Sequence, residues 1–266
     1  MSPQHQEQEH PFHLVDLSPW PILMAFSLFF VMLGAVFLMH GHSLDIYISI
    51  FGASLVFYCA YHWWKDVVSE GRVGHHHTEE VRHGLRIGMA LFVTSEVMFF
   101  FAFFLSYFSA SFFPADILDG LWVVGEGTGP PKGIETFDPW DIPFINTLIL
   151  LLSGTTVTWA HYAISQNDQQ NAVKEIGITV ILGISITWLQ AYEYHHAGFK
   201  LVDGIYAANF YLATGFHGMH VIVGTIFLTV CYFRARKGHF AHGNGHLGFE
   251  FAAWYWHFVD VVWLFL

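Results

Sequence analysis

The chain has 266 residues, of which 54% are hydrophobic and only 12% are charged. Charged residues make up about 25% of an ordinary soluble domain, so the composition excludes a typical water-soluble protein and indicates a membrane protein. The formal net charge of -11 excludes a basic surface for nucleic acid, and we expect no nucleic-acid partner.

Apolar runs follow one another along the chain, each close to the ~20 residues that an α-helix needs to cross a hydrocarbon core. Helices are expected because hydrocarbon offers no partner to an unpaired backbone group, and the runs lack the two-residue alternation of a barrel strand. The predicted spans are residues 19–39, 46–64, 85–108, 143–161, 173–194, 206–233 and 248–266. The sequence therefore predicts an all-α, polytopic membrane protein with seven transmembrane helices.

The polar connections suggest how these spans are grouped. Residues 1–18 contain acids and histidines but no Lys or Arg, which is unlike a secretory signal, so we interpret them as a cytoplasmic His-rich acidic tail. The short connection HGHSLD predicts a two-helix transmembrane hairpin over residues 19–64. Residues 65–84 are expected to form a cytoplasmic linker, and residues 85–266 a five-helix transmembrane bundle.

Lys and Arg residues are concentrated on one side of the predicted spans. The positive-inside rule places that side in the cytoplasm. The residues on this side are Lys65, Arg72, Arg82, Arg86, Lys174, Arg234, Arg236 and Lys237. The opposite side has only Lys132 and Lys200. This distribution predicts a cytoplasmic N-terminus and an external C-terminus.

Ionisable side chains interrupt the apolar runs near the expected membrane midplane, where a charge costs roughly 3 kcal/mol on insertion scales. They are Glu96, His217, His220, His257 and Asp260. His217 and His220 are three residues apart and so share one side of a helix. Two interpretations are open from residue types alone. The side chains assemble a haem or dimetal site between helices, or they form hydrogen bonds to neighbouring helices of a packed bundle.

A series of longer motifs is more specific than these single side chains. The motifs are SEVMFFFAFF, PPKGI, TFDPW, PFINTLILLLSG, TWAHYA, LQAYEY, YLATGFHGMHVIVGT and AAWYWHFVDVVWLFL. In this order, from about Pro19 to the end, the chain resembles subunit III of the haem-copper (aa3-type) cytochrome c oxidases in their proteobacterial form. The resemblance implies a two-helix hairpin separated from a five-helix bundle by a lipid-filled cleft. It also implies a place in the bacterial inner membrane, with the C-terminus in the periplasm.

By this resemblance, the chain is an accessory subunit of a respiratory terminal oxidase and has no catalytic residues of its own. Haem a and copper would belong to subunits I and II, and the chain itself would hold no redox centre and no metal. His217, His220, His257 and Asp260 would then be interhelical hydrogen-bonding residues. The expected partners are subunit I as the main contact, subunit II in the same complex, and membrane phospholipid. The alternatives are subunit III of a quinol oxidase and an independent haem- or metal-binding membrane enzyme.

The resemblance also implies that the chain binds phospholipid, stabilises subunit I and assists proton uptake by that subunit. The expected lipid-binding residues are Trp63, Trp64, His77, Arg82, Glu96 and Arg234. Indole rings favour the headgroup level, and an arginine at the end of a span suits a lipid phosphate. The family usually continues beyond the final motif, so we expect either a truncated sequence or a last helix that ends inside the outer leaflet.

Histidines are interleaved with carboxylates on the predicted cytoplasmic side. They are His5, His10, His13, His75, His76, His77 and His83. Imidazole in general titrates near about pH 6.5, so such a cluster can hold and release protons at cytoplasmic pH. The cluster is either a solvated polar surface without kinetic effect or a proton-collecting surface beside the uptake entrance of subunit I.

Overall fold

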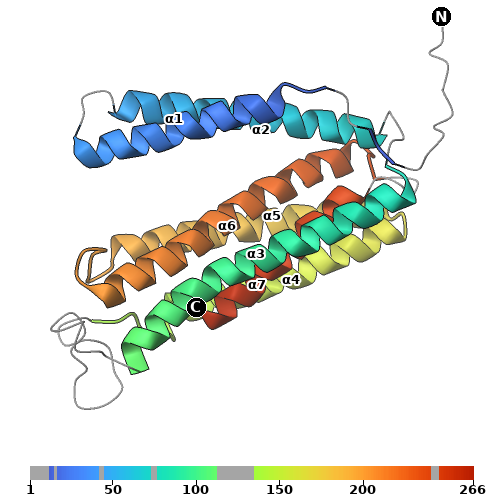
Figure 1. Ribbon diagram of the computed structural model, residues 1–266. Helices are drawn as coiled ribbons and strands as arrows, with labels where there is room; N and C mark the ends of the chain where they lie inside the picture. The colour runs from blue at the N-terminus through green and yellow to red at the C-terminus, as the bar shows by residue number, and fades with distance from the viewer. Residues whose placement is uncertain (1–11, 15–16, 42–44, 73–76, 113–134, 241–245) are drawn as a thin grey trace, which may run out of the picture. The chain divides into compact units, whose positions relative to one another are not determined.

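The computed structural model describes residues 12–14, 17–41, 45–72, 77–112, 135–240 and 246–266. Within these ranges the chain is all-helical and contains no strand, as predicted (Figure 1). The helices are α1 (Trp20–His40), α2 (Asp45–Arg72), α3 (Glu79–Phe112), α4 (Ile142–Ser165), α5 (Gln169–His195), α6 (Ile205–Arg236) and α7 (Leu247–Phe265).

Six of these helices, α1 to α6, are long and apolar enough to cross a membrane. The 19-residue helix α7 falls outside this group, because Glu250, His257, Asp260 and its Trp and Tyr residues lower its hydropathy. Nine of its 19 residues are instead buried against protein, including Trp256 and Val259, which have no exposed surface. A helix that is enclosed by other helices tolerates polar side chains that lipid would not accept. The described chain therefore has the seven predicted helices, of which six are apolar enough to cross a membrane.

Two helices extend well beyond the apolar runs. Helix α2 continues past Trp64 to Arg72, and α3 begins at Glu79, before the apolar run at residue 85. The start of α3 has the features of a helix N-terminus: the Thr78 hydroxyl accepts a hydrogen bond from the Val81 N–H at 3.3 Å. Glu79 and Glu80 lie in the first turn, where acidic side chains complement the helix dipole. Hydropathy alone does not register these polar helix ends.

The chain divides into two compact units, Met1–Leu85 and Arg86–Leu266. In the first unit, α1 and α2 approach closely at two glycines. A Cβ at Gly52 would lie 2.6 Å from the Val31 nitrogen, and a Cβ at Gly34 would lie 2.6 Å from the Ser49 nitrogen. Such contacts let helix backbones pack closely. Trp20 joins the same helices, because its indole Nε1–H donates to Asp66 Oδ2 at 2.6 Å.

In the second unit, Trp256 of α7 lies at the centre of the core formed with α4, α5 and α6. Its Nε1–H donates to Ser153 Oγ of α4 at 2.9 Å. Its ring lies against Gly183 of α5 and Gly224 of α6, where an added Cβ would come within 2.8 and 2.9 Å of the ring carbons. One indole therefore contacts three neighbouring helices, and two glycines provide the space for it.

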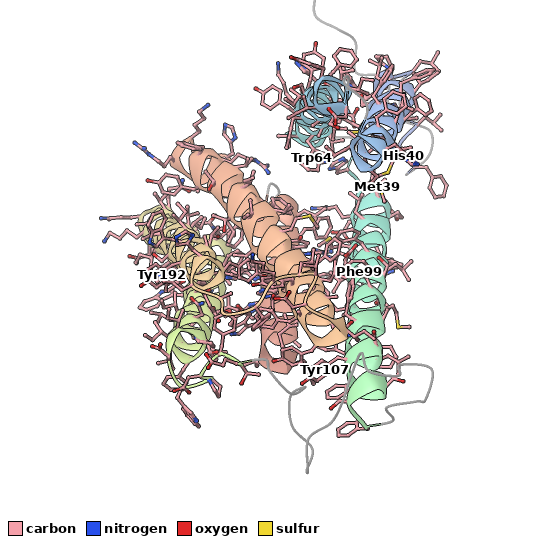
Figure 2. The ribbon with its side chains drawn as sticks, turned by 90° about the vertical axis from the view of Figure 1, so that its left-hand side faces the viewer. Met39, His40, Trp64, Phe99, Tyr107 and Tyr192 are labelled. Carbon is pink, nitrogen blue, oxygen red and sulfur yellow. The ribbon has the colours of Figure 1, made fainter. Side chains whose placement is uncertain are left out.

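The part of α3 that belongs to the second unit contacts α6 and α7 through long side chains. The rings of Phe99 and Phe216 lie edge to face with centroids 4.9 Å apart, and Tyr107 lies 6.0 Å from Tyr206. Figure 2 shows Phe99 and Tyr107 among the side chains that fill the space between α3 and α6. Arg86 forms a bidentate ion pair with Glu250 of α7, at 2.9 and 3.0 Å.

Candidate functional site

Glu96 of α3 and His220 of α6 form an intramembrane pair. Glu96 Oε2 lies 3.0 Å from His220 Nε2. His220 Nδ1 lies 2.6 Å from the Phe216 carbonyl oxygen, which can only accept, so Nδ1 carries a hydrogen. The bond between Nε2 and Oε2 then contains one further proton, which is held either by the imidazole or by the carboxyl group.

Apolar rings surround this pair. His220 lies 5.2 Å from the Phe100 ring and 6.1 Å from the Tyr255 ring, measured between centroids. The side chain of His220 is 7% exposed and that of Glu96 is 22% exposed. Whichever group holds the shared proton, the pair has no net charge. This neutrality suits surroundings that solvate an isolated charge poorly.

His217 is completely buried and joins α6 to α7. Its Nε2–H donates to the Val259 carbonyl oxygen at 3.1 Å, which assigns the hydrogen of a neutral ring to Nε2. Its ring lies 5.1 Å from the Trp263 ring. His217 Nδ1 has no hydrogen-bond partner in the described part of the chain. The side chain therefore acts as a donor between two helices.

His257 and Asp260 connect α7 to α4. His257 Nδ1 lies 3.6 Å from Asp260 Oδ2, and its Nε2 lies 3.1 Å from the Thr158 hydroxyl. Asp260 sits directly against Gly154, where any Cβ would collide with its Oδ2. Asp260 Oδ1 has no hydrogen-bond partner among the residues that the structure describes. Asp260 can therefore approach α4 this closely only because residue 154 is glycine.

The intramembrane side chains are thus divided among three separate contacts and do not converge on one point. A dimetal centre in a helical bundle needs carboxylates and histidines from several helices around the same ions. In the described ranges, three potential metal ligands come together elsewhere, at His13, Glu70 and His77.

Further along the bundle, α5 and α6 share a polar contact that we did not predict from the sequence. Gln190 Nε2 donates to the Thr214 carbonyl oxygen at 3.0 Å, and the Tyr194 hydroxyl lies 2.5 Å from Thr214 Oγ1. Glu193 is buried beside them. The motif LQAYEY contains these polar residues one turn apart, a spacing that could have identified the contact.

The predicted lipid-binding residues fall in both units. In the first, Trp64 is 67% exposed at the polar end of the α2 apolar run, while Trp63 is half-buried. His77 lies two residues before the start of α3 at Glu79, and Arg82 lies 3.6 Å from Glu79 in the first turn of that helix.

In the second unit, Arg234 lies in the last turn of α6. Its guanidinium lies over the Phe240 ring, 5.1 Å from the centroid, and a Cβ at Gly248 would lie 2.9 Å from one of its nitrogens. Arg234 therefore packs between the end of α6 and the start of α7. The sixth predicted residue, Glu96, is directed at His220.

The predicted proton-collecting histidines are described in part. His5, His10, His75 and His76 lie outside the described residues. The rings of His13 and His77 approach each other with centroids 6.0 Å apart, and His83 is exposed on α3. Two of the seven histidines are therefore neighbours in space although they are distant in sequence.

These features define a polytopic membrane protein whose buried polar groups connect helices. The family model for cytochrome c oxidase subunit III matches residues 10–266. The chain is 63% identical over 260 residues to a probable cytochrome c oxidase subunit 3 of Rickettsia bellii (strain RML369-C), covering 97% of this chain and 94% of the relative. It is 51% identical to cytochrome c oxidase subunit 3 of Prototheca wickerhamii over 259 residues, which cover 97% and 96% of the two chains.

A fish relative, cytochrome c oxidase subunit 3 of Oncorhynchus clarkii, is 46% identical over 259 residues, covering 97% of this chain and 95% of the relative. The chain belongs to the cytochrome c oxidase subunit III family. The resemblance inferred from the motifs is confirmed, and the quinol-oxidase alternative is not favoured. The chain is an accessory, non-catalytic subunit of an oxidoreductase complex and works with the other oxidase subunits in a membrane.

Proposed function

We propose that the chain supports a bacterial inner-membrane oxidase by binding phospholipid, stabilising subunit I and assisting its proton uptake. In this proposal, haem a and copper lie in subunits I and II, where cytochrome c is oxidised and dioxygen is reduced. The observation that carries the proposal is the use of the midplane histidines. His217 and His220 each bond to another helix, as expected of a supporting subunit.

The proposed arrangement in the membrane follows the family. Helices α1 and α2 form the hairpin, α3 to α7 form the five-helix bundle, and phospholipid fills a cleft between them. Helix α7 crosses the membrane inside the bundle as the seventh span. The distribution of Lys and Arg supports a cytoplasmic N-terminus and a periplasmic C-terminus.

The proposed lipid contacts combine exposed indole with basic side chains. The exposed Trp64 suits the headgroup level, and Arg82 and Arg234 offer guanidinium groups to a phosphate. His77 and the half-buried Trp63 complete the polar end of this set. Glu96 is 22% exposed beside its bond to His220, which allows an acyl chain to pass against the pair.

The experiment that tests this function compares the oxidase purified with and without this chain. We expect the complex without it to keep the optical spectra of its haems, because those lie in other subunits. It should also contain less phospholipid and lose subunit I activity faster during turnover. Equal phospholipid content and equal lifetime of the two preparations would refute a lipid-binding, stabilising role.

A further inference from the structure

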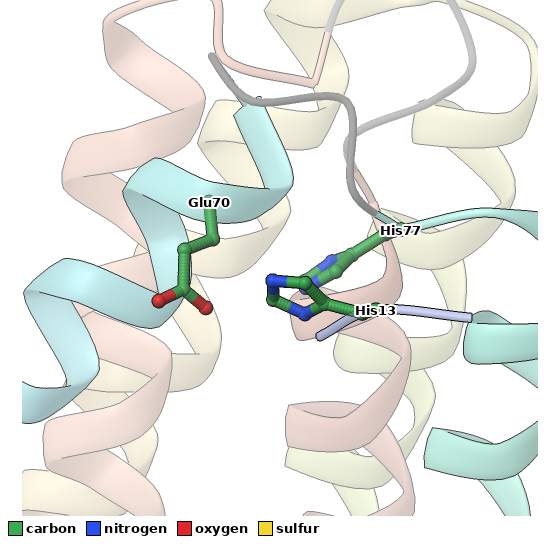
Figure 3. A group of neighbouring side chains, drawn as sticks. All are labelled: His13, Glu70 and His77. Atoms are coloured by element: carbon green, nitrogen blue, oxygen red, sulfur yellow. The ribbon is translucent and has the colours of Figure 1, made fainter. Parts of the chain in front are cut away.

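Three side chains of the first unit converge outside the midplane contacts described above. His13 precedes α1, Glu70 lies in the last turn of α2, and His77 lies two residues before the start of α3 at Glu79. One ring nitrogen of each histidine and one carboxylate oxygen of Glu70 all lie within 4.8 Å of one another. Figure 3 shows the Glu70 carboxylate directed at the two imidazole rings. All three side chains are half-buried, so an ion could reach them from water.

The local sequence holds these donors in place. A Cβ at Gly71 would lie 2.7 Å from His77 Nδ1, so the glycine next to Glu70 leaves room for the His77 ring. The capped start of α3 fixes the backbone one residue after His77. Asp66, one turn before Glu70 on α2, is occupied by a hydrogen bond from Trp20. No ion pair involves Glu70 in the described ranges.

Two imidazoles and one carboxylate are a typical donor set for a zinc ion that keeps a fourth position for water. Zinc binds such atoms at about 2.0–2.2 Å in tetrahedral geometry, which places neighbouring ligand atoms about 3.4 Å apart. The observed limit of 4.8 Å therefore requires only small rotations of the three side chains. A hard ion such as Mg²⁺ or Ca²⁺ prefers oxygen ligands, so the two nitrogens favour zinc.

We propose that His13, Glu70 and His77 form a zinc site that ties the segment before α1 to the connection between α2 and α3. The site is an exception to our expectation that the chain holds no metal. It does not depend on the proposed function. His13 and His77 also belong to the predicted proton-collecting set, and zinc competes with protons for the same nitrogen lone pairs. When zinc is bound, these two imidazoles can therefore not take up protons.

The test uses the intact oxidase complex, stripped with a chelator and dialysed against ⁶⁵Zn²⁺. We expect His13→Asn, Glu70→Gln and His77→Asn each to lose one bound zinc per complex. The affinity should fall by more than about 100-fold, since even the loss of outer-shell partners costs about 10–100-fold. Glu70→His keeps a ligand and should retain zinc. His83→Asn is the matched control, because His83 is exposed on α3 outside the cluster, and it should bind as the wild type does.

A second measurement needs no variant and so is independent of assembly. Zinc should protect His13 and His77 from diethyl pyrocarbonate, as mapped by mass spectrometry, and leave His83 reactive. X-ray absorption at the zinc edge should show two imidazoles and oxygen. Equal zinc binding in the wild type and all three ligand variants would overturn the site. Modification of His13 and His77 that zinc does not slow would overturn it as well.

Discussion

His220 of α6 and Glu96 of α3 are joined by a 3.0 Å bond, while the second ring nitrogen of His220 donates to the carbonyl oxygen of Phe216 within its own helix. The ring is therefore used at both nitrogens. Because the Nδ1 hydrogen already bonds to Phe216, a side chain that replaces Glu96 must form its hydrogen bond with Nε2 of the ring.

This arrangement predicts a graded response to substitution at Glu96. In Glu96→Gln the amide N–H can donate to Nε2, so we expect a loss of stability below about 1 kcal/mol. Glu96→Leu leaves Nε2 without a partner and should cost about 1–3 kcal/mol. The temperature at which the chain dissociates from the purified complex should be highest for the wild type, lower for Glu96→Gln and lowest for Glu96→Leu. The double variant Glu96→Leu/His220→Leu should cost less than the sum of the single variants; strict additivity would show that the two side chains are not coupled.

The packing around Trp256 predicts a cost for the smallest possible side-chain addition. Gly183→Ala would place a methyl group 2.8 Å from the ring, and overpacking of this kind costs about 1–3 kcal/mol. Gly88→Ala on α3 is the matched control, because a Cβ there meets nothing within 4 Å. The melting temperature of the complex should fall for Gly183→Ala alone. Equal melting temperatures would mean that the core around Trp256 adapts freely.

Asp168 predicts a pH dependence outside the membrane spans. It caps α5, and Asn171 donates to it through the backbone N–H at 3.1 Å and the side-chain amide at 2.6 Å. The backbone hydrogen bond from Asn171 is the main cause of a pKa lowered from 3.8. A carboxyl group with a lowered folded pKa stabilises the fold above its unfolded pKa, and this contribution is lost as the pH falls through the folded value.

Asp168→Asn keeps a cap without the titrating group. The stability difference between wild type and this variant, followed by thermal melting from about pH 6 to pH 3, should therefore change in one direction only. The wild type should lose its relative advantage as the pH falls. A difference that stays constant over this range would contradict the assigned role.

The proton-collecting hypothesis predicts a pH-dependent loss of turnover. Replacing the seven histidines His5, His10, His13, His75, His76, His77 and His83 with Asn should lower oxidase turnover progressively above about pH 7.5, where bulk protons are scarce. Little loss is expected near about pH 6. A chelator in the assay keeps zinc from confounding the result. Identical pH profiles of variant and wild type, at equal lipid content, would leave the solvated-surface interpretation.

The proposed headgroup contact at the end of α6 is tested with two neighbouring arginines. Arg234→Ala should reduce the phospholipid that purifies with the complex and leave the haem spectra unchanged, because the proposed function places the haems in other subunits. Arg236→Ala is the control from the same turn, since Arg236 is absent from the set that the family resemblance assigns to lipid. Quantitative mass spectrometry of extracted lipid measures both, and an unaltered lipid content in Arg234→Ala would remove Arg234 from the set.

The helices were predictable because apolar run length reports directly on membrane spans, whereas the helix ends were not. The continuation of α2 to Arg72 consists largely of polar residues. Such residues are equally common in exposed helices and in loops, so they do not show where a helix ends. The polar character of α7 was visible in the sequence, but the burial of nine of its 19 residues was not. That burial depends on which helices are neighbours, and hydropathy carries no information about neighbours.

The contacts of the buried histidines also could not be predicted without knowing which helices are neighbours. Spacing predicts that His217 and His220 lie on one side of α6, yet they bond to different helices, α7 and α3. A step of three residues turns a helix by about 300°, so the two rings diverge by about 60°. That divergence is enough to reach two neighbours. The convergence of His13 with Glu70 and His77 was likewise unpredictable, because long-range contacts leave no local pattern.

During synthesis, a ribosome makes α7 after α4, α5 and α6. The earlier helices can therefore already be in the bilayer when Trp256, His257 and Asp260 leave the insertion machinery. Ser153, Thr158 and Gly154 of α4 then offer these side chains hydrogen-bond partners and space at once. The burial of these α7 side chains therefore relies on helices that were synthesised before it.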